Sequence, residues 1–284
     1  MTQVKFTKMQ GAGNDFILME YDEYKKIEKL FPDIAVKLCD RHFGIGADGI
    51  FVPIEDPKTY SDLGWLFYQA DGSTAQMCGN GMRCFARFCF DKKIVSKRKF
   101  SVETLAGKIV PEVLEDFTVR VNMGKPILEP DKIPFKGSKS LNYPLWTGVK
   151  KFTVNAVSMG NPHCVIFVKD DENINELAKK YGNDIEHDNL FPEKTNVEFV
   201  KVKSKNEIDV AVWERGCGIT LACGTGACAS AVSAILNGYC DAKVKVNLPG
   251  GSLNIEWSGN LQNTDFDVFM SGEAQYVFEG VINL

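Results

Sequence analysis

Two cysteines of this chain each stand directly in front of a glycine-rich turn. The first turn is CGNGMRC, beginning at Cys78, and the second is CGTGACA, beginning at Cys223. If a helix begins at each turn, its free N–H groups and the positive end of its dipole bind anions and lower the pKa of the thiol. The neighbouring glycines, which have no Cβ, allow the oxygens of a ligand to approach the backbone. Each turn is therefore expected to place an acid or base beside a carboxylate-binding site.

A pair of such turns predicts a particular reaction. Two thiols on opposite faces of one carbon can remove a proton from one side and return a proton on the other, which inverts the stereocentre. Backbone N–H groups would stabilise the negative charge that develops on the carboxylate as the carbon loses its proton. Such a reaction requires no cofactor if water is excluded and the donors are already in place.

The two turns belong to a longer repeat. Three further fragments of the first half recur in the second half, in the same order and at nearly the same offset along the chain. They are GNDFILM from Gly13 and GNPHCVIFV from Gly160, GKIVPEV from Gly107 and GSLNIEW from Gly251, and VRVNMG ending at Gly124 and DVFMSG ending at Gly272. We therefore predict two structurally similar halves. The proline-rich segment KPILEPDKIPFKGSKSLNYPLW disfavours helix and central strand, and is expected to be the crossing between them.

Hydrophobic spacing predicts a helix after each cysteine turn. From Met82 onward apolar residues recur at helical spacing, with Arg83 and Arg87 on the other side. The second helix, GACASAVSAILNGYC, lies in a stretch between Arg215 and Asp241 that contains no charged residue, so we expect it to be buried inside its sheet. Short alternating or β-branched runs predict strands in both halves: WLFYQ, KFSVET and FTVRVNM in the first, and KFTVNAV, NVEFVKV, EIDVAVW, KVKVNL, SLNIEW and FDVFM in the second.

The composition is that of an ordinary globular protein. The 284 residues are 44% hydrophobic and 25% charged with a net charge of -4, and Lys and Arg form no basic stripe, so no nucleic-acid partner is expected. No apolar run of about 18 residues is present to cross a membrane, and the N-terminal MTQVKFTKMQGAG does not resemble a signal peptide. We therefore expect a cytoplasmic protein whose nine cysteines are reduced.

Four motifs together resemble the diaminopimelate epimerase family. They are MCGNGMRC from Met77, MGNPHCV from Met159, KTNVEF from Lys194 and WERGCGITLACGTGAC from Trp213. The resemblance runs from GAGNDF near the N-terminus to the last predicted strands and so covers essentially the whole chain. Members of this family are pyridoxal-independent enzymes that interconvert LL- and meso-diaminopimelate in lysine and peptidoglycan synthesis, using one cysteine from each of two similar domains.

The resemblance implies an α/β (α+β) fold of two pseudo-symmetric domains, each a mixed, largely antiparallel sheet wrapped around a central helix. Because the last strand of the family returns to the first domain, residues 1–125 and 273–284 would form the N-terminal domain, which carries Cys78. Residues 126–272 would form the C-terminal domain, which carries Cys223. The resemblance further implies diaminopimelate as the small-molecule substrate, no cofactor, and a homodimer, which no feature of the sequence itself specifies.

The resemblance also implies roles for individual residues. Cys78 and Cys223 would be the acid and base pair, with coupled titrations. Glu214 would accept from the α-ammonium group, Arg215 would clamp the distal carboxylate, and His163 would support the catalytic site. The remaining contacts would come from Gly79, Asn80, Gly224 and Thr225 at the α-carboxylate, and from Asn14, Asn161 and Asn196 at the distal amino acid end.

One position departs from the family pattern. Where the family usually has Phe-Asn-Ala-Asp-Gly-Ser, this chain has YQADGS, so Gln69 replaces an asparagine that contacts substrate. The amide is kept on a side chain that is one methylene longer. We expect Gln69 to bind the substrate, either in a slightly reshaped pocket or with a different affinity.

Other kinds of site fit the sequence less well. The cysteines within each turn are too far apart for a CxxC redox pair, and pairs of ligands with zinc spacing are missing, with His42, His163 and His187 scattered along the chain. The GAG and GIG turns near the N-terminus lack the residues that follow a phosphate-binding loop. Neither a metal site nor a nucleotide site is therefore expected.

Three alternative functions remain. A proline or hydroxyproline racemase shares the double-cysteine arrangement, but usually has histidine where Asn80 stands and lacks the WERG approach to the second cysteine. An isomerase of the phenazine-biosynthesis type lacks the cysteine pair. A carboxylate-binding protein without turnover is the alternative from a different class, because the same amides would hold an anion.

Overall fold

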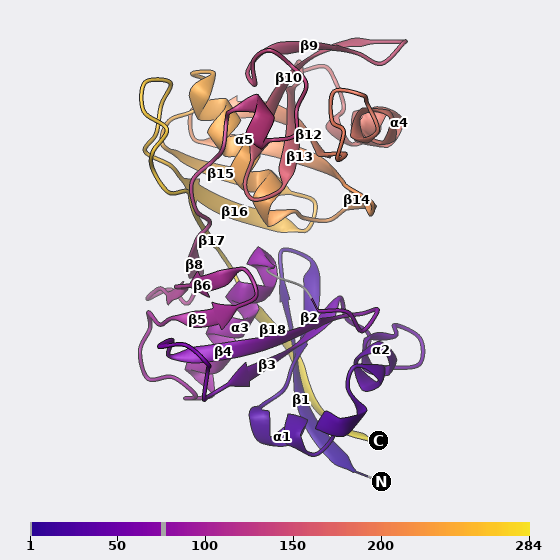
Figure 1. Cartoon of the computed structure of the whole chain (residues 1–284), viewed down its shortest axis with the longest axis vertical. Helices are drawn as coiled ribbons and strands as arrows, with labels where there is room; N and C mark the ends of the chain where they lie inside the picture. The colour runs from indigo at the N-terminus through magenta and orange to yellow at the C-terminus, as the bar shows by residue number, and fades with distance from the viewer. Residues whose placement is uncertain (1, 75–77) are drawn as a thin grey trace. The chain divides into compact units, whose positions relative to one another are not determined.

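The structure is a computed structural model that describes residues 2–74 and 78–284. The chain divides into two compact units: unit 1 comprises Met1–Asn122 and Ser271–Leu284, and unit 2 comprises Met123–Met270. Each unit is a mixed sheet that packs one long helix against one face and carries shorter or amphipathic helices on the other (Figure 1). The α+β class and the sheet around a central helix, both implied by the resemblance, are confirmed.

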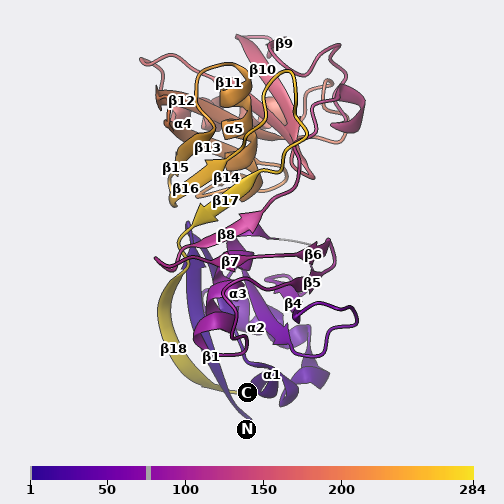
Figure 2. The ribbon, with the colours of Figure 1, turned by 90° about the vertical axis from the view of Figure 1, so that its left-hand side faces the viewer.

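Unit 1 is built on a seven-stranded sheet with the order β18-β1-β2-β3-β4-β5-β6. The pairs β2–β3 and β4–β5 are parallel and the others are antiparallel. The last strand of the chain therefore lies beside the first, as Figure 2 shows. The strands are β1 (Gln3–Gly11), β2 (Asn14–Leu18), β3 (Gly49–Ile54), β4 (Leu63–Gln69), β5 (Val102–Thr104), β6 (Gly107–Ile109) and β18 (Gln275–Asn283). Outside this sheet, β7 (Glu112–Val113) pairs antiparallel with β8 (Val119–Asn122).

Both faces of this sheet are covered, because side chains alternate between them. In β3, Ile50 and Val52 point into a core formed with α1 (Tyr21–Lys25) and α2 (Asp33–Cys39), which are joined through η1 (Glu28–Leu30). Phe51, between them, points to the other face, where α3 (Gly79–Asp91) packs. Phe51 stacks on Phe67 at 4.3 Å between ring centroids and on Trp65 at 4.9 Å.

The helix α3 follows the first cysteine turn, as predicted, but one of its arginines is not where the spacing placed it. Arg83 was expected on the polar side of the helix and is instead fully buried. The guanidinium is accommodated because its Nη1 donates to Asn80 Oδ1 at 2.8 Å and its Nε donates to the carbonyl of Glu273 at 3.2 Å. Arg87, in contrast, is only partly buried and pairs with Asp91.

Unit 2 has the strand order β16-β15-β13-β12-β11-β10-β9, with β14 on β13. The pairs β11–β12 and β13–β15 are parallel, and the remaining pairs among these strands are antiparallel. The strands are β9 (Tyr143–Trp146), β10 (Lys151–Ser158), β11 (Pro162–Phe167), β12 (Asn196–Ser204), β13 (Glu207–Glu214), β14 (Gly218–Thr220), β15 (Lys243–Leu248) and β16 (Gly251–Glu256). A further strand, β17 (Phe269–Gly272), runs across the boundary between the two units in the sequence.

Two helices cover the two faces of the sheet of unit 2 (Figure 1). The helix α5 (Gly224–Leu236) is buried along almost its whole length, which confirms the prediction from its lack of charge. The helix α4 (Ile174–Glu186) covers the other face, where Ala178, Tyr181 and Ile185 pack into the core. No such helix was predicted from the sequence.

The proline-rich segment, predicted as a crossing, also contributes to the core of unit 2 and contains a strand. Residues after the short 3-10 helix η2 (Pro130–Lys132) enter the core of unit 2. There the ring centroids of Phe135 and Phe191 lie 5.0 Å apart. Pro144 lies within a strand, β9, which is tolerated because β9 ends the sheet order and a proline removes no hydrogen bond on an outer edge.

None of the helices in the described part of the chain is long and apolar enough to span a membrane. Seven of the nine cysteines are buried, and no disulfide joins any of the nine in the described part of the chain.

Candidate active site: two matching cysteine turns

The two cysteine turns have the same local geometry. Cys78 is the N-cap of α3 and Cys223 is the N-cap of α5, both with an extended backbone. In each turn the N–H group of the third helical residue donates to the thiol: Gly81 N lies 3.3 Å from Cys78 Sγ, and Gly226 N lies 3.3 Å from Cys223 Sγ. Each sulfur therefore replaces the side-chain oxygen that usually caps a helix.

Two of the four turn glycines serve packing within the protein. A Cβ atom on Gly81 would lie 2.3 Å from Cζ of Phe51, and one on Gly226 would lie 2.7 Å from Oε1 of Glu198. Both distances are shorter than real contacts allow, so any side chain would push the helix start away from the sheet. At these two positions the absence of Cβ lets the start of the helix approach the sheet.

In unit 1, the two predicted asparagines are brought together beside Cys78. Asn80, buried at the first turn of α3, donates from Nδ2 to Asn14 Oδ1. Asn14, at the start of β2, donates from Nδ2 to Asp48 Oδ2 at 3.0 Å. Arg83 completes the chain by donating to Asn80 Oδ1. Both amides therefore have a defined orientation.

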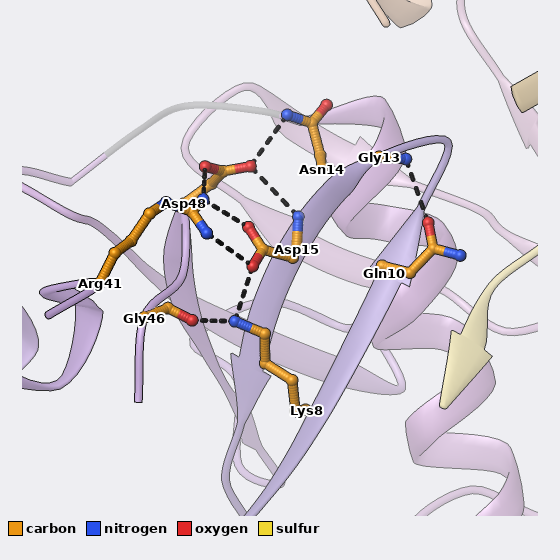
Figure 3. Close-up of polar contacts among 8 residues, drawn as sticks. All are labelled: Lys8, Gln10, Gly13, Asn14, Asp15, Arg41, Gly46 and Asp48. Atoms are coloured by element: carbon orange, nitrogen blue, oxygen red, sulfur yellow. Dashed lines mark hydrogen bonds and ion pairs between the residues drawn. The ribbon is translucent and has the colours of Figure 1, made fainter. Parts of the chain in front are cut away.

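A charged cluster lies behind Asn14 (Figure 3). Arg41 donates to both oxygens of Asp15, at 3.0 and 2.7 Å, and to Asp48 Oδ1 at 2.6 Å. Lys8 is buried and contacts Asp15 Oδ2 at 2.7 Å, and its ammonium also donates to the carbonyl of Gly46. Burial raises the pKa of Asp15, but the hydrogen bonds from Arg41 and Lys8 outweigh it and lower the pKa to about 2.

The remaining predicted residue of unit 1, Gln69, is exposed at the end of β4. Its Nε2 donates to Ser73 Oγ at 2.8 Å, and its backbone N–H donates to the carbonyl of the same residue at 2.8 Å. The side-chain amide is thus held within its own turn. Gln69 pairs with Gly49 where β3 runs beside β4.

In unit 2, a chain of contacts leads from Cys223 into the sheet. Cys223 Sγ and Thr225 Oγ1 lie 3.4 Å apart, and Asn161 Nδ2 donates to Thr225 Oγ1 at 3.3 Å. His163 Nε2 lies 3.0 Å from Asn161 Oδ1, and His163 Nδ1 lies 2.7 Å from Glu198 Oε1. His163 and Glu198 are both fully buried, on the parallel strands β11 and β12.

The surroundings of Cys223 are anionic. Burial raises the pKa of its thiol well above the usual value, and the nearby carboxylates of Glu214 and Glu198 raise it further. The hydrogen bonds from Thr225 and from the Gly226 N–H act in the opposite direction but do not outweigh these causes. The lowered pKa expected from the helix N-terminus is therefore wrong for Cys223. Burial likewise raises the pKa of Glu214, whose Oε1 accepts from Thr220 Oγ1 at 2.5 Å.

Arg215 and Asn196 are joined through the backbone. Asn196 is buried, and its Oδ1 accepts from the Arg215 N–H at 2.9 Å while its Nδ2 donates to the carbonyl of Pro162 at 2.9 Å. The guanidinium of Arg215 is exposed and donates from Nη1 to the carbonyl of Glu193 at 3.1 Å. Asn196 thus connects the start of β11 to the end of β13.

Sequence reasoning missed three carboxylates that position these residues. Asp48 holds Asn14, and Glu198 holds His163. Glu186, at the end of α4, accepts from Trp213 Nε1 at 2.7 Å and from the Gly216 N–H at 3.0 Å, and so holds the WERG turn. Two of them had a local signal, since Asp48 lies in the glycine-rich segment GIGADG and Glu198 lies in the motif KTNVEF.

Among the described residues, no group of three or more His, Cys, Asp and Glu side chains is arranged to hold a metal ion.

Comparison with known proteins connects these features to one family. The model of the diaminopimelate epimerase family matches residues 6–129 and 155–277. The chain is 45% identical over 289 residues to the diaminopimelate epimerase of Halothermothrix orenii, covering 99% of this chain and 98% of the relative. It is 47% identical over 285 residues to that of Carboxydothermus hydrogenoformans, covering 98% of each chain.

Solved structures show the same fold at low sequence identity. A phenazine biosynthesis protein of the PhzF family from Bacillus anthracis matches with a TM-score of 0.69 and 13% identity, over 100% of both chains. A hydroxyproline epimerase from Agrobacterium vitis matches with a TM-score of 0.66 and 11% identity, over 99% of this chain and 92% of that one. These likenesses establish the fold alone and do not favour the racemase or phenazine-type alternatives. The family model matches most of the chain, and relatives that are 45% and 47% identical to it align over nearly its whole length. The chain therefore belongs to the diaminopimelate epimerase family.

Proposed function

We propose that this protein is a diaminopimelate epimerase that interconverts the LL and meso isomers, with Cys78 and Cys223 as the two proton-transferring groups. The observation that carries the proposal is the repeated geometry of the turns, in which each thiol caps a 13-residue helix and accepts the N–H of the third helical residue. One cysteine removes the α-proton as a thiolate while the other delivers a proton as a thiol, and the roles exchange in the reverse direction.

The helix starts supply the electrostatic part of the reaction. Unpaired N–H groups at the beginning of α3 and α5 would bind the α-carboxylate and stabilise the charge that develops on it as the carbon loses its proton. This role falls to Gly79, Asn80, Gly224 and Thr225. No cofactor takes part in the proposed reaction, because the acid, the base and the anion-stabilising groups all belong to the protein.

The acidic surroundings of Cys223 agree with its proposed role as a proton donor. The raised pKa of Cys223 favours the thiol, which is the form that delivers a proton. Glu214, close to Cys223, would accept from the α-ammonium group, and the cationic substrate would in turn favour its carboxylate form. His163 would support this side of the site by orienting Asn161, and through it Thr225.

The distal end of the substrate would be recognised by the residues that the family resemblance implies. Arg215 is exposed and donates to a neutral backbone carbonyl at 3.1 Å, and a substrate carboxylate would bind its guanidinium more strongly, in a bidentate manner. Asn161, Asn196 and Gln69 would contribute amide groups.

A direct assay tests the proposal. The purified protein should convert LL-diaminopimelate to the meso isomer, and Cys78→Ala and Cys223→Ala should each abolish the conversion. Racemisation of proline without any action on diaminopimelate would favour the racemase alternative. Saturable binding of diaminopimelate without inversion would favour the binding-protein alternative, and full turnover in either cysteine variant would contradict the two-thiol mechanism.

We extend the proposal to a cytoplasmic homodimer that acts in lysine and peptidoglycan synthesis. Support for self-association comes from β18, which ends the sheet order of unit 1 and exposes several apolar side chains: Tyr276, Val277, Phe278 and Val281. Exposed apolar edge strands pair readily with a second chain. Sedimentation velocity should show a dimer that Val277→Lys with Val281→Lys dissociates, whereas a wild-type monomer would contradict the assignment.

A further inference from the structure

The direction of the hydrogen bonds through Asn14 and Asn80 is set from both ends. At one end stands the carboxylate of Asp48, which in its ionised form can only accept. At the other end stands the guanidinium of Arg83, which can only donate. Between them Asn14 must point Nδ2 to Asp48 and Oδ1 to Asn80, and Asn80 must point Oδ1 to Arg83. Neither amide can be reversed without breaking a bond to a charged group.

Asp48 is itself held in place by hydrogen bonds to both of its oxygens. Arg41 donates to Asp48 Oδ1 at 2.6 Å, which leaves Oδ2 to accept from Asn14 (Figure 3). The backbone N–H of Asp15 also donates to Asp48 Oδ2, at 3.1 Å. Arg41 is fixed in turn by its two bonds to Asp15. The amide of Asn14 is thus oriented by a rigid, charged support.

The charge of this bonded set favours an anion. It contains the cations Lys8, Arg41 and Arg83 and the carboxylates Asp15 and Asp48, so positive charge is in excess. The positive end of the α3 dipole lies at Asn80 and adds to the excess. A cationic ammonium group would be repelled here, whereas a carboxylate would be attracted.

From this arrangement we infer that Asp48 is a positioning residue that turns the amide of Asn14 so that it offers an N–H group, next to Asn80, to a carboxylate of the substrate. Asn14 then serves the same carboxylate as Asn80 and not an amino group at the distal end. The inference rests on the proposed function for the identity of the substrate, but the recognition of a carboxylate is independent of turnover. Asp48 itself does not touch the substrate.

Two fragments of the substrate separate the possibilities. Pimelic acid carries both carboxylates of diaminopimelate without the amino groups, and 1,5-diaminopentane carries both amines without the carboxylates. Binding of each to the intact protein is measured by calorimetry, with no need for activity. In Asp48→Asn, the amide of Asn14 loses its charged acceptor, and we expect pimelic acid to bind about tenfold more weakly, as for loss of a hydrogen bond to a charged group. Binding of 1,5-diaminopentane should change less than about twofold.

Asp62→Asn provides a matched control. Asp62 is also a carboxylate of unit 1 and its side chain is 36% exposed, against 37% for Asp48. It accepts from the N–H and hydroxyl groups of Ser101 and has no part in the Asn14 chain. The affinity of Asp62→Asn for pimelic acid should equal that of the wild type.

A double-mutant cycle shows whether Asp48 acts through Asn14. Asn14→Ala should weaken the binding of pimelic acid to a similar extent, and adding Asp48→Asn to it should cause no further loss. Additive losses would overturn the positioning role, and so would a loss in Asp48→Asn that is confined to 1,5-diaminopentane. If Asp48→Asn does not fold, Asn14→Ala alone decides which fragment the amide recognises. Failure of the wild type to bind pimelic acid would also overturn the inference, whereas binding without epimerase activity would refute only the proposed function.

Discussion

Replacement of Gly81 by alanine should destabilise unit 1 and disturb Cys78 together. The added Cβ would lie 2.3 Å from Cζ and 2.6 Å from Cε2 of Phe51. Since ordinary contacts begin at 3.4 Å, Phe51 or the start of α3 must move by about 1 Å. Phe51 cannot retreat easily, because it is fully buried and stacked between Phe67 and Trp65.

The size of the effect follows from two opposing contributions. Overpacking of a filled core typically costs about 1–3 kcal/mol. The replacement of glycine by alanine in a helix raises the free energy of unfolding by at most about 1 kcal/mol, through higher helix propensity and the smaller entropy of the unfolded chain. We therefore expect a net loss of about 1–2 kcal/mol in the free energy of unfolding. The Gly81 N–H donates to Cys78 Sγ at 3.3 Å. Movement of the helix start would therefore displace this thiol and should also lower kcat.

Urea unfolding followed by circular dichroism measures the change in stability. Gly64→Ala is the control, because Gly64 lies in the same sheet and its added Cβ would meet Ile54 at 3.3 Å, a contact that a small shift relieves. This variant should lose less than about half as much stability as Gly81→Ala. If Gly81→Ala unfolds at the wild-type urea concentration and keeps full activity, the close approach of α3 to Phe51 is not what requires a glycine at this position.

Three further predictions concern other parts of the molecule. Glu198→Gln should lower the free energy of unfolding by about 1–3 kcal/mol, because His163 loses a buried hydrogen bond to a charged group; an unchanged urea midpoint would argue against that bond. Asp15 has a pKa lowered from 3.8 to about 2, so its contribution to stability is complete above its unfolded pKa and is lost as the pH falls from about 4 to 2. Asp15→Asn should make the loss of stability between these pH values shallower, which acid titration at fixed urea concentration measures; a curve as steep as that of the wild type would contradict the role of the Lys8 and Arg41 contacts. Mild oxidation should join Cys78 to Cys223 and abolish activity, and a reductant should restore it; activity that stays lost after reduction would exclude this disulfide as the cause.

The sequence was most informative where local pattern and tertiary environment agree. The helix α5 was predicted as buried because its stretch lacks charge, and the structure confirms it. The cysteine turns were placed at helix starts because Cys-Gly-x-Gly is followed by helical spacing, and both helices begin there. In these cases a few neighbouring residues carry the whole signal.

Other features depend on contacts that a local pattern does not contain. The burial of Arg83 requires acceptors from Asn80 and from the carbonyl of Glu273, far away in the sequence. Burial raises the pKa of Cys223, and the carboxylates of Glu214 and Glu198, on the neighbouring strands β13 and β12, raise it further. The helix α4 was not predicted, although its apolar residues Ala178, Tyr181 and Ile185 follow helical spacing. Roles for Asp48, Glu198 and Glu186 emerge only when their bonding partners are known.

The origin of the hydrogen on the inverted carbon tests the central claim most directly. During initial turnover of LL-diaminopimelate in deuterium oxide, two separate thiols require that the meso product carry solvent deuterium at the inverted carbon while the remaining LL substrate stays unlabelled. A single base serving both faces would return the original hydrogen to the product, or would label substrate and product at comparable rates. Either of these results would contradict the account of one cysteine on each side of the carbon.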